Sequence, residues 1–480
     1  MTAIEMRVDL SALVDALASR NNDKIVAIAR EHLQDGEAVD VLIGRIGLLA
    51  AKGDADGHTV ITLTAAAMLS RLLHTIPLPL EGNGQVHERA LPLFVQALFA
   101  AAPAVQAGFT RQASSPPPLY PSGLQEGQTV NSVMHDAVYH NDPLLVERLL
   151  LGLYGTGADY RTMQVRAYDG ISTTFQDAGH PLMFAVRGFQ LLDTVEWGDR
   201  APAIIHWLAP HLPLRPTSNE PDWISALRNY TTDSAHDVSG VRKRLAAPKD
   251  ENALPLRRLV LSDADTTQVC QGVYDALLTN GASPRAIGSV LALAAAEVMQ
   301  MVDDGDRELF VQVAHGLLFS SAIHLAFRQV QDVEILALLF TSAAYINALY
   351  KEVAGQQHTP STHAATASSR ILGGGLIAPS LLEALENQLK EQDIPAALTT
   401  AQRYLKLGYD VRALFATIGL VAAQNDALVD QGHTLQIVQA ASEEFMAWPT
   451  ALTDTNIEAL LLAALRAAAF GKRNELVAQL

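Results

Sequence analysis

Cysteine is almost absent from this chain of 480 residues, because Cys270 is the only one. A single thiol excludes an internal disulfide, a redox-active cysteine pair and a thiolate cage for a metal ion. Aromatic residues make up only 6% of the chain, whereas hydrophobic residues make up 49%, with alanine and leucine as the main contributors. Since alanine and leucine favour helices and sheets favour aromatic and β-branched residues, we predict an all-α fold.

Basic residues are also scarce, with 34 lysines and arginines against 51 aspartates and glutamates, for a net charge of −17. An acidic surface repels phosphate groups, so we predict that nucleic acids and anionic membranes are not partners. The N-terminus lacks the apolar core of a signal peptide, and we expect no uncharged stretch long enough to span a bilayer. The expected location is the cytoplasm.

Internal repeats are visible in this acidic chain. The hexapeptide IGLLAA at 46–51 precedes Gly57-His58-Thr59, and IGLVAA at 418–423 precedes Gly432-His433-Thr434. A third block has LALAAA at 291–296 followed by Gly305-Asp306, and a second block has Gly179-His180. Agreement at several anchors favours repetition over chance. We predict four diverged helical repeat units, at residues 9–108, 130–212, 266–350 and 378–471.

Three stretches between these units look like connectors. Residues 114–123 (SSPPPLYPSG) are too rich in proline to continue a helix, 213–258 mix prolines with asparagines, and 355–375 are rich in Gly, Ser and Thr. An array of helical units can stay open as a solenoid or close into a ring. Only a ring would bring the four equivalent turns near one another.

A short D-x-G-H/D motif marks the repeated turn and gives two interpretations. In the functional one, three imidazoles and one carboxylate bind zinc or non-haem iron. The predicted ligands are His58, His180, Asp306 and His433. Neighbouring carboxylates would orient the imidazoles from the second coordination sphere by accepting the other ring proton. These are Asp177, Asp303 and Asp430.

The second interpretation of the motif is structural. A glycine ends one helix and the next residue begins another, so that Asp306 is an N-cap and Pro181 a first-turn proline. This interpretation explains the aspartate well but explains less well why histidine occurs three times. The sequence leaves both open.

Other side chains give weaker signals. His206 and His324 lie in apolar segments at comparable places of their units, where a core histidine is more usual than a ligand. We keep them as second-rank candidates. The chain has no phosphate-binding glycine loop of the Walker or G-x-G-x-x-G type after a strand, so we predict no nucleotide cofactor.

Several segments resemble a known group of proteins. Residues 313–327 (VAHGLLFSSAIHLAF), 338–347 (LLFTSAAYIN), 136–143 (DAVYHNDP) and 432–436 (GHTLQ) are similar to the helical region that precedes the iron–sulfur domain in bacterial Rieske-type [2Fe–2S] proteins. The resemblance implies a redox setting. A Rieske centre needs two cysteines and two histidines, however, so this chain with one cysteine holds no iron–sulfur cluster.

Two functions follow as expectations. The first is a metal-dependent oxidoreductase, with non-haem iron as the expected metal, that acts on a small, largely apolar molecule and draws electrons from a redox partner protein. The alternative is a helical-repeat interaction module or redox-partner scaffold without chemistry. The recurrent histidines and the redox resemblance place the enzyme first, because a scaffold has little reason to keep histidines at equivalent turns.

Overall fold

Helices form throughout the described part of the chain, as the alanine- and leucine-rich composition predicts. The computed structural model describes residues 9–77, 88–111, 115–157, 160–215, 220–238, 240–241, 247–330, 332–356, 377–452 and 457–480. Within these ranges the named elements are all helices, and β-pairing is limited to one bridge between Asn425 and Arg473. The prediction of an all-α fold is therefore confirmed.

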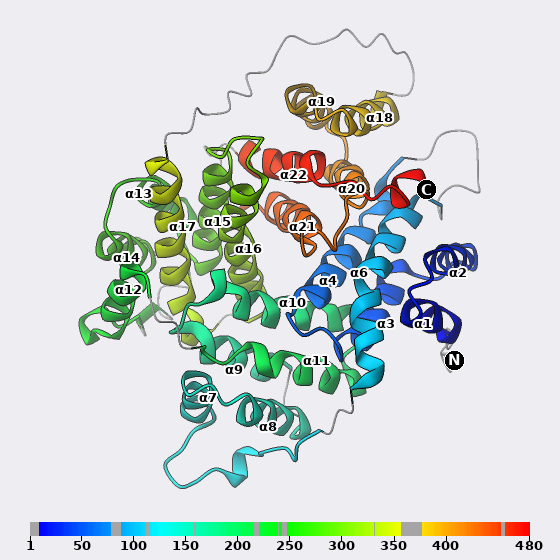
Figure 1. Ribbon diagram of the computed structural model, residues 1–480. Coiled ribbons are helices and arrows are strands. Elements are labelled where there is room, and N and C mark those ends of the chain that lie inside the picture. The colour runs from blue at the N-terminus through cyan, green and yellow to red at the C-terminus, as the bar shows by residue number, and fades with distance from the viewer. Residues whose placement is uncertain are drawn as a thin grey trace.

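Four largely buried helices lie at the middle of the molecule (Figure 1). They are α4 (His58–Ser70), α10 (His180–Val195), α16 (Arg307–Gln329) and α21 (His433–Met446). Helix α4 contacts α10, α10 contacts α16, α16 contacts α21, and α21 contacts α4 again. The four central helices thus contact one another in a closed cycle, with α10 diagonal to α21.

Each central helix packs between the helix that precedes it and the helix that follows it. The preceding helices are α3 (Val39–Ala50), α9 (Tyr160–Ser172), α15 (Pro284–Met299) and α20 (Val411–Ala422). The following helices are α6 (Leu91–Thr110), α11 (Ala201–Leu208), α17 (Ala337–Gly355) and α22 (Glu458–Phe470). These flanking helices bury the apolar surface of the central ones.

Helical hairpins lie outside this inner part. They pair α1 (Ser11–Ala18) with α2 (Asn22–Gln34), α7 (Val130–Tyr139) with α8 (Pro143–Gly155), and α18 (Ile377–Lys390) with α19 (Ile394–Lys406). The second helix of each hairpin begins after a capping side chain that accepts a backbone N–H, namely Asn21, Asp142 and Asp393. In the third block, α12 (Asp222–Thr232), α13 (Leu254–Val260) and α14 (Thr266–Tyr274) occupy the comparable place.

The predicted connectors have different outcomes. Residues 115–123 of the first form no α-helix, and only a short 3₁₀ turn lies at Pro121–Gly123. The connector at 213–258 contains α12 and the beginning of α13, because Pro221 directly precedes α12 and Pro255 lies in the first turn of α13, where proline is tolerated. Residues 357–375 of the third connector lie outside the described residues. The bounds of the four repeat units stay a prediction.

Three helical stretches are long and apolar enough to cross a membrane by length and composition alone. They are Leu91–Thr110, Arg307–Gln329 and Val333–Gly355. The expectation that no such stretch exists was wrong, since Leu91–Thr110 carries no charged residue over 20 positions. In this structure between 72% and 83% of the apolar window in each stretch is buried among other helices.

Candidate metal centre

Four imidazole rings converge where the central helices meet. His58, His180 and His433 are the first residues of α4, α10 and α21, and His315 lies in the third turn of α16. Neighbouring ring centres are 4.8 Å apart for His58–His180, 4.9 Å for His180–His315, 4.8 Å for His315–His433 and 5.5 Å for His433–His58. The diagonal from His180 to His433 measures 6.4 Å. We call this group the four-histidine centre.

The Nε2 atoms of these rings face one another in pairs. His58 Nε2 lies 3.1 Å from His180 Nε2, and His433 Nε2 lies 3.1 Å from His315 Nε2. Candidate ligand atoms of His58, His180 and His433 all lie within 4.8 Å of one another. A buried group of three histidines that could hold a metal ion is therefore present, and His315 adds a fourth ring to it.

The opposite nitrogen of three rings donates to the main chain. His180 Nδ1 donates to the Asp177 carbonyl and His433 Nδ1 to the Asp430 carbonyl, both at 2.5 Å. His315 Nδ1 donates to the Val311 carbonyl at 2.9 Å. Because a carbonyl oxygen can only accept, Nδ1 carries the proton and Nε2 of each neutral ring keeps a free lone pair.

His58 has a carboxylate, not a carbonyl, near Nδ1. Its Nδ1 atom has no hydrogen-bond partner and lies 3.6 Å from Asp56 Oδ1. The contact with His58 lowers the pKa of the Asp56 carboxyl. The neutral His58 ring can carry its proton on Nδ1, facing Asp56, or on Nε2, where it donates to His180 Nε2 at 3.1 Å.

The Nε2 lone pairs of His315 and His433 face each other at 3.1 Å and repel unless a cation lies between them. An additional proton is a poor candidate near pH 7, because burial and then the neighbouring His315 lower the pKa of His433 to about 3. Burial likewise lowers the pKa of His180 to about 4 and also lowers the pKa of His315. A transition-metal ion satisfies the same lone pairs without a proton.

The spacing can be compared with that of a mononuclear site. Metal–nitrogen bonds of about 2.1 Å place opposite ligands no more than about 4.2 Å apart and neighbouring tetrahedral ligands about 3.4 Å apart. The two 3.1 Å pairs lie near the second value. The ligand atoms of His58, His180 and His433 lie within 4.8 Å of one another, a limit that exceeds the first value by about 0.6 Å, so these three rings would move closer together around one ion.

Glycines allow the turns before α4, α10 and α21 to lie close to the next helix of the cycle. Gly57, Gly179 and Gly432 precede their histidines with φ of +85°, +88° and +73°. A Cβ atom at each would lie 2.6 Å or less from a side chain of the next helix in the cycle, and would therefore overlap it. These side chains each lie four residues after a histidine and are Phe184, Phe319 and Thr62.

Gly432 gives a direct test of this packing. We expect Gly432→Ala to lower the free energy of unfolding by about 2–4 kcal/mol, because a left-handed φ is unfavourable and the new methyl would lie 1.9 Å from Thr62 Oγ1. Gly408→Ala is the control, since Gly408 has φ +77° and open space around it, and should cost about 1 kcal/mol. Equal losses in urea unfolding would show that the close contact at Gly432 is unimportant.

Asp306 lies elsewhere, although it was predicted as the fourth ligand. It is the N-cap of α16, and its Oδ1 atom accepts from Leu309 N at 3.0 Å. The alignment of the repeats placed Asp306 at the position of the histidines that begin the other central helices. Helix α16, however, begins about two turns before it reaches the level of the four-histidine centre. His315 comes nine residues after Asp306, about 13 Å along the helix, and takes the fourth place. Asp306 is thus a helix cap, as the structural interpretation predicts, and the three predicted histidines begin helices after left-handed glycines and also lie together.

A short sequence pattern shared by α10 and α16 identifies His315. His180-Pro-Leu-Met-Phe184 and His315-Gly-Leu-Leu-Phe319 share the pattern H-x-L-x-F. Both phenylalanines then contact a glycine of the preceding helix in the cycle, at Gly57 and Gly179. Alignment on this pattern rather than on the turn would have identified the fourth histidine.

The predicted orienting aspartates act mainly through other atoms. Asp177 and Asp430 offer their backbone carbonyls to His180 and His433 at 2.5 Å, and the Asp177 carboxylate lies farther from His180 Nδ1, at 3.6 Å. The Asp430 carboxylate accepts instead from Gly432 N, Thr434 N and Arg307 Nη2, at 3.0, 3.0 and 3.3 Å, and fixes the turn. Asp303 lies in the turn before α16, where its carbonyl accepts from Asp306 N.

A buried carboxylate that was not proposed as a site residue holds the corresponding turn of α4. Asp54 accepts from Val60 N at 3.0 Å and from Trp207 Nε1 at 3.1 Å. Burial raises the pKa of Asp54 to about 6. It therefore occupies the place before α4 that Asp430 occupies before α21.

The second-rank histidines form pairs outside the centre. His324 Nδ1 donates to Glu444 Oε2 at 2.7 Å, and both side chains are buried. His206 Nδ1 donates to Glu147 Oε1 at 2.9 Å. Each imidazole thus has a carboxylate partner; His324 is a buried core histidine, whereas the side chain of His206 is 41% exposed.

The low pKa values of the central histidines make the stability of metal-free protein depend on pH. In the unfolded chain the pKa of a histidine returns to about 6.5, so unfolding takes up protons below that pH and acidification destabilises the fold. Asp54 acts oppositely, because the folded state binds its proton below about pH 6. We expect a net loss of about 2 kcal/mol between pH 7 and pH 5, measured by urea unfolding.

The control for this pH dependence is a variant that lacks two of the buried histidines. In His180→Gln/His433→Gln their unfavourable contribution disappears, while those of His315 and Asp54 remain. The stability that this variant loses between pH 7 and pH 5 should therefore be clearly smaller than the loss in the wild type. A wild-type protein that gains stability over the same interval would contradict the assignment of neutral buried histidines.

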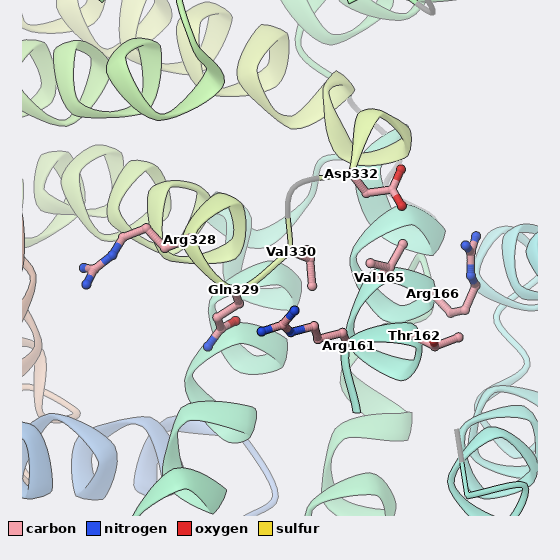
Figure 2. Close-up of a pocket in the computed structure, with 8 residues that line it drawn as sticks. All are labelled: Arg161, Thr162, Val165, Arg166, Arg328, Gln329, Val330 and Asp332. Carbon is pink, nitrogen blue, oxygen red and sulfur yellow. The ribbon is translucent and has the colours of Figure 1, made fainter. Parts of the chain in front are cut away.

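The cleft drawn in Figure 2 is separate from the four-histidine centre. It has a volume of 530 Å³ and lies between α9 and the end of α16, about 21 Å along α16 from His315. In Figure 2, Arg161 reaches toward Gln329, whereas Arg328 points away from the cleft. None of the four histidines is among its lining residues, which are Arg161, Thr162, Val165, Arg166, Arg328, Gln329, Val330 and Asp332.

Comparisons of this chain with protein-family models, with curated protein sequences and with solved structures found no match. The resemblance to the helical region of Rieske-type proteins therefore stays a prediction. What the four-histidine centre can do is inferred from its own geometry.

Proposed function

We propose that the four-histidine centre binds one divalent transition-metal ion and that the protein is a metal-dependent oxidoreductase. The observation that carries the proposal is the group of His58, His180 and His433, with His315 Nε2 against His433 Nε2, in which three of the four rings already donate their Nδ1 proton to backbone carbonyls. Hydrogen bonds of this kind fix the tautomer and orientation of metal-binding histidines. The centre is built as a set of ligands before any ion arrives.

The donor set narrows the class of metal. Imidazole suits zinc, copper, iron and nickel, whereas calcium and magnesium require oxygen ligands. Four neutral ligands fill a tetrahedral zinc site and leave no position for a substrate. A six-coordinate iron ion bound by the same four rings keeps two positions for outside ligands. Iron is therefore the metal of the proposed enzyme, and zinc would make the centre structural.

The surroundings favour a small and largely apolar substrate. The Phe184 ring lies 5.3 Å from His180 and 5.8 Å from His58, and Trp207 lies 5.9 Å behind it. Phe184 and Trp207 are both buried. Electrons for the reaction would come from a redox partner protein, in line with the single, inert cysteine of this chain.

The cycle of contacts also supports a proposal about the fold. We infer that α4, α10, α16 and α21 are the corresponding helices of four diverged repeat units that close into a ring. Each packs between its preceding and following helix, and each contributes one histidine to the centre. Closure is what allows one residue from each unit to reach a common point.

Elemental analysis of purified protein tests the proposed function. The expected result is about one iron ion per chain, with zinc as a substitute after growth in zinc-rich medium. Protein that contains no stoichiometric metal, and takes up neither Fe²⁺ nor Zn²⁺ after dialysis, would remove the proposal. The chain would then be the non-catalytic helical-repeat module that the sequence also allows.

A further inference from the structure

A layer of polar side chains crosses the interior of the four central helices, about two turns below the four-histidine centre. Arg187 Nη1 donates to Glu443 Oε2 at 2.7 Å, and Gln190 Nε2 donates to Glu443 Oε1 at 2.9 Å. Gln439 Nε2 donates to the same Oε1 atom at 2.9 Å. Arg187 and Gln190 belong to α10, and Gln439 and Glu443 belong to α21.

The other two central helices also contact this layer. Arg187 Nη2 donates to Ser321 Oγ of α16 at 3.1 Å. Thr64 Oγ1 of α4 donates to the backbone carbonyl of Arg187 at 3.1 Å. One arginine therefore links all four helices of the cycle, and its side chain is 7% exposed.

The ion pair between Arg187 and Glu443 joins α10 and α21, the same two helices that carry His180 and His433 at opposite corners of the four-histidine centre. His180 and Arg187 lie seven residues apart on α10, about 10 Å along the same face. His433 and Glu443 lie on α21, so both levels join the same two helices. Helices α10 and α21 are not neighbours in the cycle of contacts, and these side chains set the distance between them.

Burying such a pair is expensive unless its hydrogen bonds are complete. Burial alone would raise the pKa of Glu443, but the charge of Arg187 and hydrogen bonds from Arg187, Gln190 and Gln439 lower it. The carboxylate is thus ionised and fully engaged. A well-packed apolar pair would hold α10 and α21 together equally firmly. It would not fix their separation, because apolar contacts lack the defined length of hydrogen bonds.

We propose that the Arg187–Glu443 ion pair is a positioning pair that presets the distance between His180 and His433, and so the affinity and coordination geometry of the metal. This inference rests on the proposed function. The 6.4 Å diagonal joins two helices that are not neighbours in the cycle, so contacts between neighbouring helices do not set it directly. Residues that hold metal ligands in place from outside typically contribute 10- to 100-fold to affinity.

The test uses Co²⁺, whose visible absorption reports the coordination geometry. Full-length wild type is compared with Arg187→Met/Glu443→Gln, which removes both charges together, so that neither charge is left buried without its counterion. Arg187→Lys keeps the charge and serves as the conservative variant. Arg466→Met is the matched control, because Arg466 is a second buried arginine with an acidic partner, Asp304, outside the central layer.

The double variant is expected to bind Co²⁺ about 10- to 100-fold more weakly, with a shifted visible spectrum. Arg187→Lys should keep the wild-type spectrum with a smaller loss of affinity, and Arg466→Met should keep both. A folded double variant with wild-type affinity and spectrum would overturn the inference while leaving the metal site intact. If the double variant does not fold, wild-type affinity in Arg187→Lys would overturn it. Wild type that binds no Co²⁺ would overturn the proposed function as well.

Discussion

His433→Ala is expected to weaken metal binding by about two to three orders of magnitude, and His315→Ala is expected to do the same. If four ligands share a metal-binding free energy of about 10–16 kcal/mol, the loss of one costs about 2.5–4 kcal/mol, or about 100- to 1,000-fold in affinity. The His315 variant is the more informative, because His315 was not among the ligands predicted from the sequence. It is placed in the centre by the 3.1 Å contact of its Nε2 atom with His433 Nε2 and by its ring contact with His180. Metal content and competition with a chelator measure both effects.

Asp306→Asn is the control for these variants. Asparagine also caps helices, and Asp306 contacts the beginning of α16 rather than the histidines, so metal content should stay at the wild-type level. His324→Ala is a second control, since that histidine belongs to a pair with Glu444. Loss of metal in Asp306→Asn together with retention in His315→Ala would restore the ligand set predicted from the sequence.

Arg466→Met is expected to lower the free energy of unfolding by about 3–5 kcal/mol. Arg466 is the largest fully buried side chain, and its guanidinium donates to the carbonyls of Met299 and Val302 at 2.7 and 2.6 Å. It also forms an ion pair with Asp304 at 2.8 Å. Methionine fills much of the volume but leaves these acceptors at the end of α15 without a partner. Urea unfolding of the metal-free protein measures the loss.

Arg412→Met separates burial from the mere presence of an ion pair. Arg412 also bonds a carboxylate, Asp410, at 2.7 Å, but its side chain is 54% exposed. An exposed pair contributes less than about 1 kcal/mol, so this variant should be close to wild type. If the two arginine variants lost equal stability, the carbonyl contacts of Arg466 would not matter as described.

Much of the centre was visible in the sequence because the turn that precedes each histidine is a local feature. A glycine with positive φ followed by the first residue of a helix can be found from residue types alone, as at Gly57-His58 and Gly432-His433. The fourth histidine was not found because it depends on where α16 begins along its own axis. That offset follows from the packing of whole helices, which no turn motif encodes.

The sequence correctly predicted that Asp177 and Asp430 contact His180 and His433, but the atoms that accept the hydrogen bonds differ from those predicted. Carboxylates were expected to orient the rings, yet the acceptors at Asp177 and Asp430 are main-chain carbonyls. A carbonyl acceptor exists at every residue, so side-chain type cannot identify it. The aspartate at 430 is explained by a different task, since its carboxylate binds Gly432 N and Thr434 N and so shapes the turn.

The central claim is that one metal ion is bound by four histidines. Anomalous X-ray diffraction from crystals of the metal-loaded protein, collected at the absorption edge of the metal, tests it most directly. The account predicts a single strong peak about 2.1 Å from the Nε2 atoms of His58, His180, His315 and His433. A peak at another group of residues, or loaded crystals without a peak among these rings, would contradict it.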